Sequence, residues 1–315
     1  MKVIKAICFT LCLTLYSFSH LLITAQEQVA EQITEQVIDQ VIEQATEQVV
    51  EPVDLSIEGK FVWADLYSND IASSIDFYTK TFGWSVIKIG DKNDVYYLFM
   101  SDDKAVAGVI DRPAEQEGAV EALWIGSIGV QNIQQVVDSA KSEGSTVLMN
   151  PSNFDLFGTR AVIADPRGSI FSLLDIGSIN PDNKKHLSDR WGWAQLFSIN
   201  PKKASGFYYS VFDYKINKGE PPRMKSIYIL YSHDTAQAGI AKLPSNYEQR
   251  DHWINFIEVD NVKDTITKAT ENGAKLISDL KEDQRLAVIV DPNGAFLGLK
   301  SKSLAKTPEN NPEQK

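Results

Sequence analysis

The chain is poor in the side chains that most metal and redox sites use. Its 315 residues include 2 cysteines and 4 histidines. Both cysteines, Cys8 and Cys12, lie in the amino-terminal apolar segment. We therefore expect the rest of the chain to lack disulfides, thiol nucleophiles and cysteine metal ligands. After residue 25, histidine occurs only at His186, His233 and His252, so few residues are available for imidazole chemistry.

Long basic stretches are also lacking. The formal net charge is -11, and no run of Lys and Arg is longer than a pair. Because binding to a phosphate backbone requires a basic surface, we expect no nucleic-acid partner. The sequence has no phosphate-binding or dinucleotide-binding glycine motif, no G-x-S-x-G and no H-E-x-x-H, so nothing in it indicates the enzyme classes that use these motifs.

The amino terminus has the pattern of a secretory signal. Residues 1–5 carry two lysines, and residues 6–16 are almost continuously apolar. We predict a signal peptide at residues 1–25, a mature chain that begins near Gln26, and a periplasmic or secreted protein without stable membrane insertion. An uncleaved membrane anchor is the alternative.

Residues 26–58 form a low-complexity spacer. Between residues 27 and 54, tetrapeptides such as EQVA and EQIT follow one another without interruption. A period of four overshoots the helical turn, and acids at every fourth position repel each other, so a long coiled coil is disfavoured. We predict an acidic tether, with a docking helix for an envelope partner as the alternative.

A sequence repeat organises the remainder of the chain. The segment Trp63–Trp84 returns as Trp193–Tyr214, with a shared Trp-Ala-x-Leu, a Phe-Tyr pair and a later Phe. In both copies an alternating stretch changes to apolar residues spaced three and four apart, which predicts a strand followed by a helix. Most of the aromatic residues in this pattern are expected in the core.

Four β-α-β-β-β units follow from extending this interpretation along the chain. In each half the last two strands of the second unit flank a turn, Asp165–Gly168 or Asp291–Gly294, whose Pro and Gly favour a hairpin. The predicted domains are residues 59–177 and 187–302. They are joined by a polar linker at 178–186 and followed by a disordered polar tail at 303–315.

The motifs WADL, FYTKTFGW, LWIGSIGV and RAVIADPRGSIFSLL, together with the four units, resemble two tandem domains of the vicinal-oxygen-chelate superfamily. This superfamily contains glyoxalases, bleomycin-resistance proteins and extradiol dioxygenases. The resemblance implies an α+β fold in which each pair of units forms a cupped sheet with helices outside and a cleft within. In catalytic members the cleft holds a divalent metal.

The resemblance also places the family's metal ligands on this sequence. The positions are Trp63, Ile125 and Ser172 with residues 107–109 in the first domain, and Trp193, Ile254 and Gly298 with residues 238–240 in the second. None of them supplies the expected imidazole or carboxylate. We therefore predict no metal and no other cofactor.

Candidate ligand-binding residues follow from the same positions and from their neighbours on the same strand face. They are Trp63, Asp65, Ile125, Ser172, Trp193, Gln195, His252 and Ile254. Asp65 shares the face of Trp63, whereas the equivalent Gln195 cannot act as a base, which suggests that the two domains differ in function. The catalytic residues are unknown, with Asp65 and His252 as candidates.

Two classes of function remain open at this point. The first is a metal-free binding protein whose indole-walled clefts hold a small apolar or aromatic molecule. The second is an enzyme of the lactoylglutathione lyase or extradiol dioxygenase type, with a divalent metal at a non-standard site or with an acid-base pair. The missing ligands favour the first class.

Overall fold

A computed structural model describes residues 58–90, 95–112, 122–154, 158–175, 190–219, 226–243, 250–279 and 285–302. All of them belong to one unit of the chain, Asp54–Lys315. The predicted signal peptide, the spacer up to residue 57, the linker and the tail lie outside the described residues. Within the described ranges, no helix is both long enough and apolar enough to cross a membrane.

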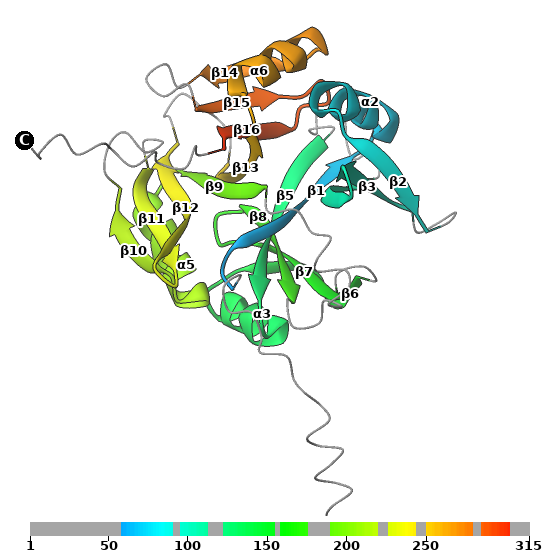
Figure 1. The fold of residues 1–315 in the computed structure, drawn as a ribbon. Coiled ribbons are helices and arrows are strands. Elements are labelled where there is room, and N and C mark those ends of the chain that lie inside the picture. The colour runs from blue at the N-terminus through cyan, green and yellow to red at the C-terminus, as the bar shows by residue number, and fades with distance from the viewer. Residues whose placement is uncertain are drawn as a thin grey trace, which may run out of the picture. The chain divides into compact units, whose positions relative to one another are not determined.

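The first half forms an eight-stranded mixed sheet with two helices (Figure 1). Its strands are β1 (Phe61–Ser68), β2 (Ser85–Ile89), β3 (Tyr96–Ser101), β4 (Lys104–Asp111), β5 (Ala122–Val130), β6 (Thr146–Phe154), β7 (Gly158–Ala164) and β8 (Ile170–Asp175). They are ordered β2-β3-β4-β1-β5-β8-β7-β6. Helices α2 (Ile71–Phe82) and α3 (Ile133–Ser142) follow β1 and β5. The antiparallel pair β1 and β5 joins the two units at the centre of the sheet.

The second half repeats this topology. Its strands are β9 (Trp191–Ser198), β10 (Lys215–Lys218), β11 (Ser226–Ser232), β12 (Thr235–Lys242), β13 (His252–Val259), β14 (Lys275–Asp279), β15 (Leu286–Val290) and β16 (Phe296–Ser301), and its helices are α5 (Pro201–Phe212) and α6 (Val262–Glu271). The strand order is β10-β11-β12-β9-β13-β16-β15-β14. The prediction of an α+β fold built from four β-α-β-β-β units is confirmed, and each sheet uses strands from one predicted domain.

Capping residues set the bounds of the first helix in each half. The Asp70 side chain accepts a hydrogen bond from the Ser73 amide at 2.9 Å at the start of α2, and Asn200 caps α5 in the same way. Helix α2 ends at Gly83, which adopts the left-handed conformation with φ of 72°. At the equivalent end of α5 an aspartate, Asp213, adopts that conformation with φ of 54°.

The strands alternate between two faces. On β1, Ala64 and Leu66 pack against the helices, and this side is called the helix face. Trp63 and Asp65 point to the other side, called the site face. Irregular register between Phe61 and Trp63 allows Phe61 to pack on the helix face as well. β9 repeats the alternation, so both sheets have a helix face and a site face.

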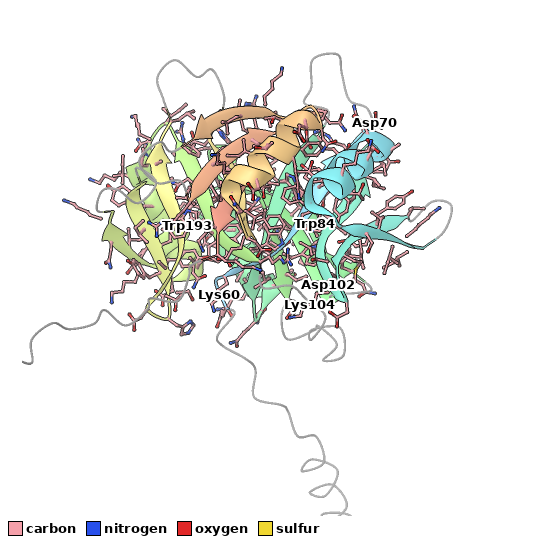
Figure 2. All side chains as sticks on the ribbon, turned by 45° about the horizontal axis from the view of Figure 1, so that its top comes forward. Lys60, Asp70, Trp84, Asp102, Lys104 and Trp193 are labelled. Carbon is pink, nitrogen blue, oxygen red and sulfur yellow. The ribbon has the colours of Figure 1, made fainter. Side chains whose placement is uncertain are left out.

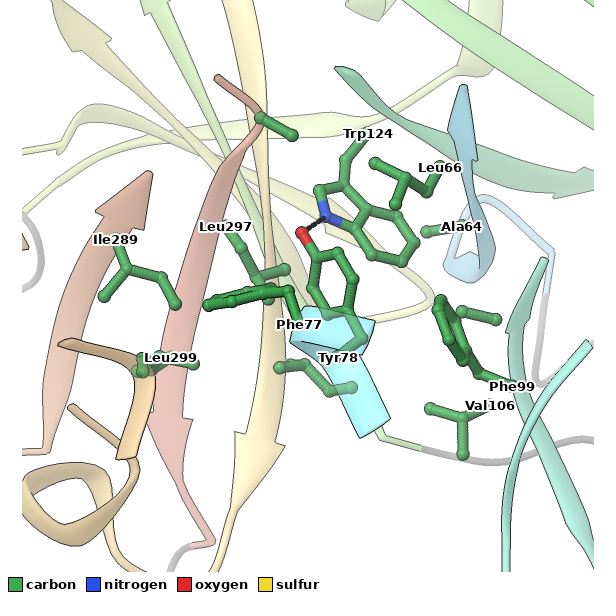
Figure 3. Packing of buried hydrophobic residues seen from close by; sticks show 14 of the residues in the cluster. Ala64, Leu66, Phe77, Tyr78, Phe99, Val106, Trp124, Ile289, Leu297 and Leu299 are labelled. Atoms are coloured by element: carbon green, nitrogen blue, oxygen red, sulfur yellow. Dashed lines mark hydrogen bonds between the residues drawn. The ribbon is translucent and has the colours of Figure 1, made fainter. Parts of the chain in front are cut away.

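Both large hydrophobic clusters of the helix faces contain residues from the two halves. One cluster combines Phe77 and Tyr78 of α2 with Leu297 and Leu299 of β16 (Figure 3). The other combines strands β5, β7 and β8 and helix α3 with α5 and strands β9, β11 and β12. The two sheets therefore share their main hydrophobic core, whereas each site face has a separate small cluster of its own.

Candidate functional site

The site face of the first sheet is organised around Asp65, which is only 1% exposed. Its Oδ1 accepts hydrogen bonds from the Tyr96 hydroxyl at 2.6 Å and from the Trp63 indole nitrogen at 3.1 Å. Its Oδ2 accepts one from Arg160 Nη1 at 2.8 Å. Gly108, which pairs with Asp65 in the sheet, makes this packing possible, because a Cβ there would overlap both Asp65 and the Tyr96 hydroxyl.

Arg160 reaches Asp65 from β7, a strand on the far side of β5 and β8. Its guanidinium carbon lies 4.1 Å from the centroid of the Phe154 ring, a cation–π contact. Phe154 also packs edge-on against Tyr96, with centroids 5.1 Å apart. The ion pair is thus surrounded by aromatic rings, and Tyr67, Tyr96 and Phe154 are each partly exposed.

Burial and the Asp65 charge keep the phenols of this cluster protonated. Burial, together with the negative charge of Asp65, raises the pKa of Tyr67 to about 12. The same two causes raise the pKa of Tyr96 well above its usual value. Burial acts to lower the pKa of the Arg160 guanidinium, but Asp65 and the two phenols raise it, and the net pKa lies above the ordinary value. The cluster therefore holds one negative charge, one positive charge and two phenolic O–H groups.

The site face of the second sheet is aromatic rather than ionic. Trp193, at the position equivalent to Trp63, is partly exposed, and its indole nitrogen donates a long hydrogen bond of 3.4 Å to Gln195. Phe197 and Phe296 belong to the same hydrophobic cluster and are also partly exposed. Figure 2 shows Trp193 among the strands of the second sheet, away from Trp84 of the first.

His252 lies within this aromatic cluster. Its ring stacks on Phe197 with centroids 5.7 Å apart and an interplanar angle of 21°, and Phe296 lies at 6.0 Å. The Nδ1 atom is 2.9 Å from the Arg250 carbonyl oxygen. Because a carbonyl oxygen can only accept a hydrogen bond, Nδ1 carries the hydrogen. Burial lowers the pKa of His252, an effect that the Arg250 hydrogen bond and the nearby Asp251 only partly oppose. The neutral ring is thus favoured.

The other predicted residues lie on the same two faces. Ile125 pairs with Asp65, and Ile254 pairs with Gln195; both isoleucines are buried. Ser172 is buried two strands from β1, and its hydroxyl donates to the Ala161 carbonyl at 3.0 Å. The structure therefore groups the eight predicted residues into two sites, one on each sheet, and brings Asp65 and His252 to different sheets.

The side chains present do not fit a divalent metal at either site. Among the described residues, no three His, Cys, Asp or Glu side chains are grouped so that they could hold a metal ion. In the first sheet both Asp65 oxygens already accept hydrogen bonds from three other side chains. In the second sheet the space beside Gly298, where the resemblance places a glutamate, is filled by the Phe256 ring. The donor set at both positions is therefore wrong for such an ion.

Sequence reasoning missed several residues that complete these sites. Arg160 was not predicted. A single arginine in an otherwise apolar strand, together with a buried acid elsewhere in the same sheet, is a recognisable signal of an ion pair. Identifying it would have required the register of β5, β8 and β7, which the sequence does not supply. Tyr96, Phe154, Phe197 and Phe296 were also missed, because aromatic residues in strands are usually explained by core packing.

Comparison with known proteins fits this architecture. Residues 60–173 match the sequence profile of the Glyoxalase/Bleomycin resistance protein/Dioxygenase superfamily. These residues, which form most of the first sheet and its helices, belong to this superfamily. The chain is also 28% identical over 252 residues to "Anthracycline biosynthesis protein DauV" of Streptomyces sp. (strain C5), a match covering 75% of this chain and 91% of that protein. "Anthracycline biosynthesis protein DnrV" of Streptomyces peucetius is 27% identical over 256 residues, with the same coverage.

Solved structures of superfamily enzymes share the fold at low sequence identity. A Mn(II)-bound glyoxalase from Novosphingobium aromaticivorans gives a TM-score of 0.52 at 14% identity, over 78% of this chain and 82% of that one. The 2,3-dioxygenase LapB from Pseudomonas sp. KL28 gives 0.51 at 11% identity, over 81% and 97%. These likenesses concern the arrangement of strands and helices, not the chemistry of the site.

Proposed function

We propose that the protein binds a planar aromatic molecule, without a metal ion, at the site face of the second sheet. The observation that carries this proposal is the partly exposed Trp193, which lies in a cluster with Phe197 and Phe296 where the resemblance expects a metal site. Partly exposed aromatic rings favour ligands that stack on them and bury apolar surface against the protein.

The neutral side chains at this site agree with an uncharged ring system as ligand. His252 favours its neutral form, and Gln195 replaces the aspartate of the first sheet. The two relatives named for anthracycline biosynthesis add a chemical class, because an anthracycline contains a planar system of fused rings. We take a fused polycyclic aromatic molecule as the ligand class.

Titration with 2-hydroxyanthracene, a planar fused-ring compound without a carbonyl group, tests the proposal. We expect the compound to quench tryptophan fluorescence, and Trp193→Ala to weaken binding by about tenfold or more, since a stacked indole dominates such contacts. Tyr209→Ala is the matched control, because Tyr209 is 57% exposed on α5 and lies outside both sites. Equal affinity of the Trp193→Ala variant and the wild type would refute the proposal.

A metal-dependent lyase or dioxygenase is the alternative, and the donor set described above gives it no support. Metal analysis of the purified protein decides between the two, because one metal ion bound per chain would contradict a metal-free site.

We also propose that the protein is exported through residues 1–25. Mass spectrometry of the protein recovered from cells tests this, and an intact Met1–Ala25 segment would refute cleavage.

A further inference from the structure

The first sheet carries a polar cluster that the second sheet lacks. The strand register makes Asp65 equivalent to Gln195, because they pair with Ile125 and Ile254, and with Gly108 and Gly239. By the same comparison Tyr67 is equivalent to Phe197. Arg160 is equivalent to Leu286, since each lies two residues before the valine that pairs with Ser172 or Gly298. An acid, a phenol and a guanidinium are thus replaced by an amide, a phenyl ring and an aliphatic side chain in the second sheet.

The fold therefore does not require the Asp65–Arg160 pair. The second sheet has the same strand order without it. Removing two charges from water is costly, and replacing a buried ion pair by side chains of similar volume is often neutral or stabilising. A buried pair kept in one of two equivalent places is consequently a candidate for a role in binding.

The cluster offers hydrogen-bond donors to a ligand. Asp65 is fully engaged by Trp63, Tyr96 and Arg160. The Nε–H of Arg160, in contrast, is buried and has no acceptor among the residues that the structure describes. A buried donor without a partner is unfavourable, so an acceptor atom placed there would be stabilising. The Tyr67 hydroxyl, kept protonated next to Asp65, is a second donor.

The surroundings specify the kind of acceptor. The adjacent Asp65 carboxylate repels an anion, so a neutral oxygen is preferred to a carboxylate or phosphate. The partly exposed rings of Tyr67, Tyr96 and Phe154 border the pair and suit a flat apolar body. A carbonyl group on an aromatic ring system combines both properties.

We propose that Arg160, fixed by Asp65, binds the carbonyl oxygen of a flat aromatic ketone or quinone at the site face of the first sheet. The guanidinium then supplies the fixed positive charge beside the strand positions that hold a metal ion in catalytic relatives. This site is independent of the aromatic site on the second sheet, and each proposal can fail without the other.

The test compares 9-fluorenone with fluorene, which has the same three fused rings without the carbonyl oxygen. Both are titrated into the full-length chain carrying Trp193→Ala, so that the site on the second sheet does not contribute. We expect 9-fluorenone to bind about tenfold more tightly than fluorene, as one hydrogen bond from a charged donor provides. With ¹³C-labelled carbonyl, the infrared stretching frequency should fall when the ketone binds.

The double variant Asp65→Gln, Arg160→Leu, also in the Trp193→Ala chain, copies the side chains of the second sheet. It should stay folded, bind the two compounds equally and leave the carbonyl frequency unchanged. Arg160→Lys retains the positive charge but loses the Nε–H, so it should also lose most of the tenfold preference, even if the double variant does not fold. The proposal is wrong if Arg160→Lys keeps both the preference for 9-fluorenone over fluorene and the shift of the carbonyl frequency. It is also wrong if the Trp193→Ala chain without further substitutions shows neither the preference nor the shift.

Discussion

The hydroxyl of Tyr78 lies 2.8 Å from the carboxylate of Asp291, a residue 213 positions later in the chain. The same hydroxyl accepts a hydrogen bond from the Trp124 indole at 2.7 Å. The other half repeats this arrangement, since Tyr208 contacts Asp165 at 3.0 Å. The tyrosine of each Phe-Tyr pair therefore contacts the Asp-Pro turn of the opposite half, which explains why both motifs occur twice.

These contacts predict that the two halves unfold together. Tyr78→Phe removes the hydroxyl that donates to Asp291 Oδ2 and accepts from the Trp124 indole, so the free energy of unfolding should fall by about 1 to 3 kcal/mol. Tyr208→Phe should have the same effect. Urea denaturation followed by tryptophan fluorescence and by circular dichroism should give one coincident transition in the wild type and in both variants.

Tyr209→Phe is the control for this experiment, because Tyr209 is next to Tyr208 in the sequence but has an exposed side chain. Loss of its hydroxyl should alter the free energy of unfolding by less than about 0.5 kcal/mol. Two separate transitions in the wild type would show that the halves are stable independently. A pair of variants as stable as the control would show that the tyrosine–aspartate bonds contribute nothing.

The contact between Gly108 and the ion pair gives a second prediction. A Cβ on Gly108 would overlap the Tyr96 hydroxyl and Asp65 Oδ1. Gly108→Ala should therefore lower the free energy of unfolding by about 1 to 3 kcal/mol, through overpacking and a disturbed hydrogen-bond network. Thermal melting of the purified variant measures this.

Gly206→Ala provides the opposite case in the same chain. Gly206 lies in α5, and nothing comes within 4 Å of an added Cβ. The substitution should stabilise the protein by up to about 1 kcal/mol, because alanine has the higher helix propensity. If Gly108→Ala raises the melting temperature as Gly206→Ala does, the packing described around Asp65 is incorrect.

Local structure was largely predictable from the sequence, whereas contacts across the sheet were not. Asp70, Gly83 and Asn200 cap their helices, and residues of these types are recognisable caps in the sequence, because capping depends on residues a few positions apart. The partner of Asp65 depends on register over several strands, which no local pattern encodes. The core that α2 shares with the second sheet was invisible for the same reason.

Trp63 and Trp193 show the limit most clearly. Both are tryptophans at equivalent positions of a repeat, and their strand and face were predicted. Trp63 is 1% exposed, since its indole belongs to the network of Asp65 and Tyr96, whereas the Trp193 indole donates a long hydrogen bond to the neutral Gln195 and stays partly exposed. The difference arises from neighbours on other strands rather than from the repeat itself.

The last prediction concerns pH and His252. Burial lowers the pKa of His252 in the folded protein below the ordinary value of 6.5. The unfolded chain consequently binds a proton more readily than the folded one, so this contribution to stability is complete above about pH 6.5 and is lost as the pH falls through the folded pKa. The melting temperature should therefore decrease between pH 7 and pH 5. His252→Leu, which introduces the residue of the equivalent position Leu123, should reduce that decrease. A decrease of the same size in the wild type and in the His252→Leu variant would assign the pH dependence to other groups, and would remove the argument that the second site keeps its imidazole neutral for an uncharged aromatic ligand.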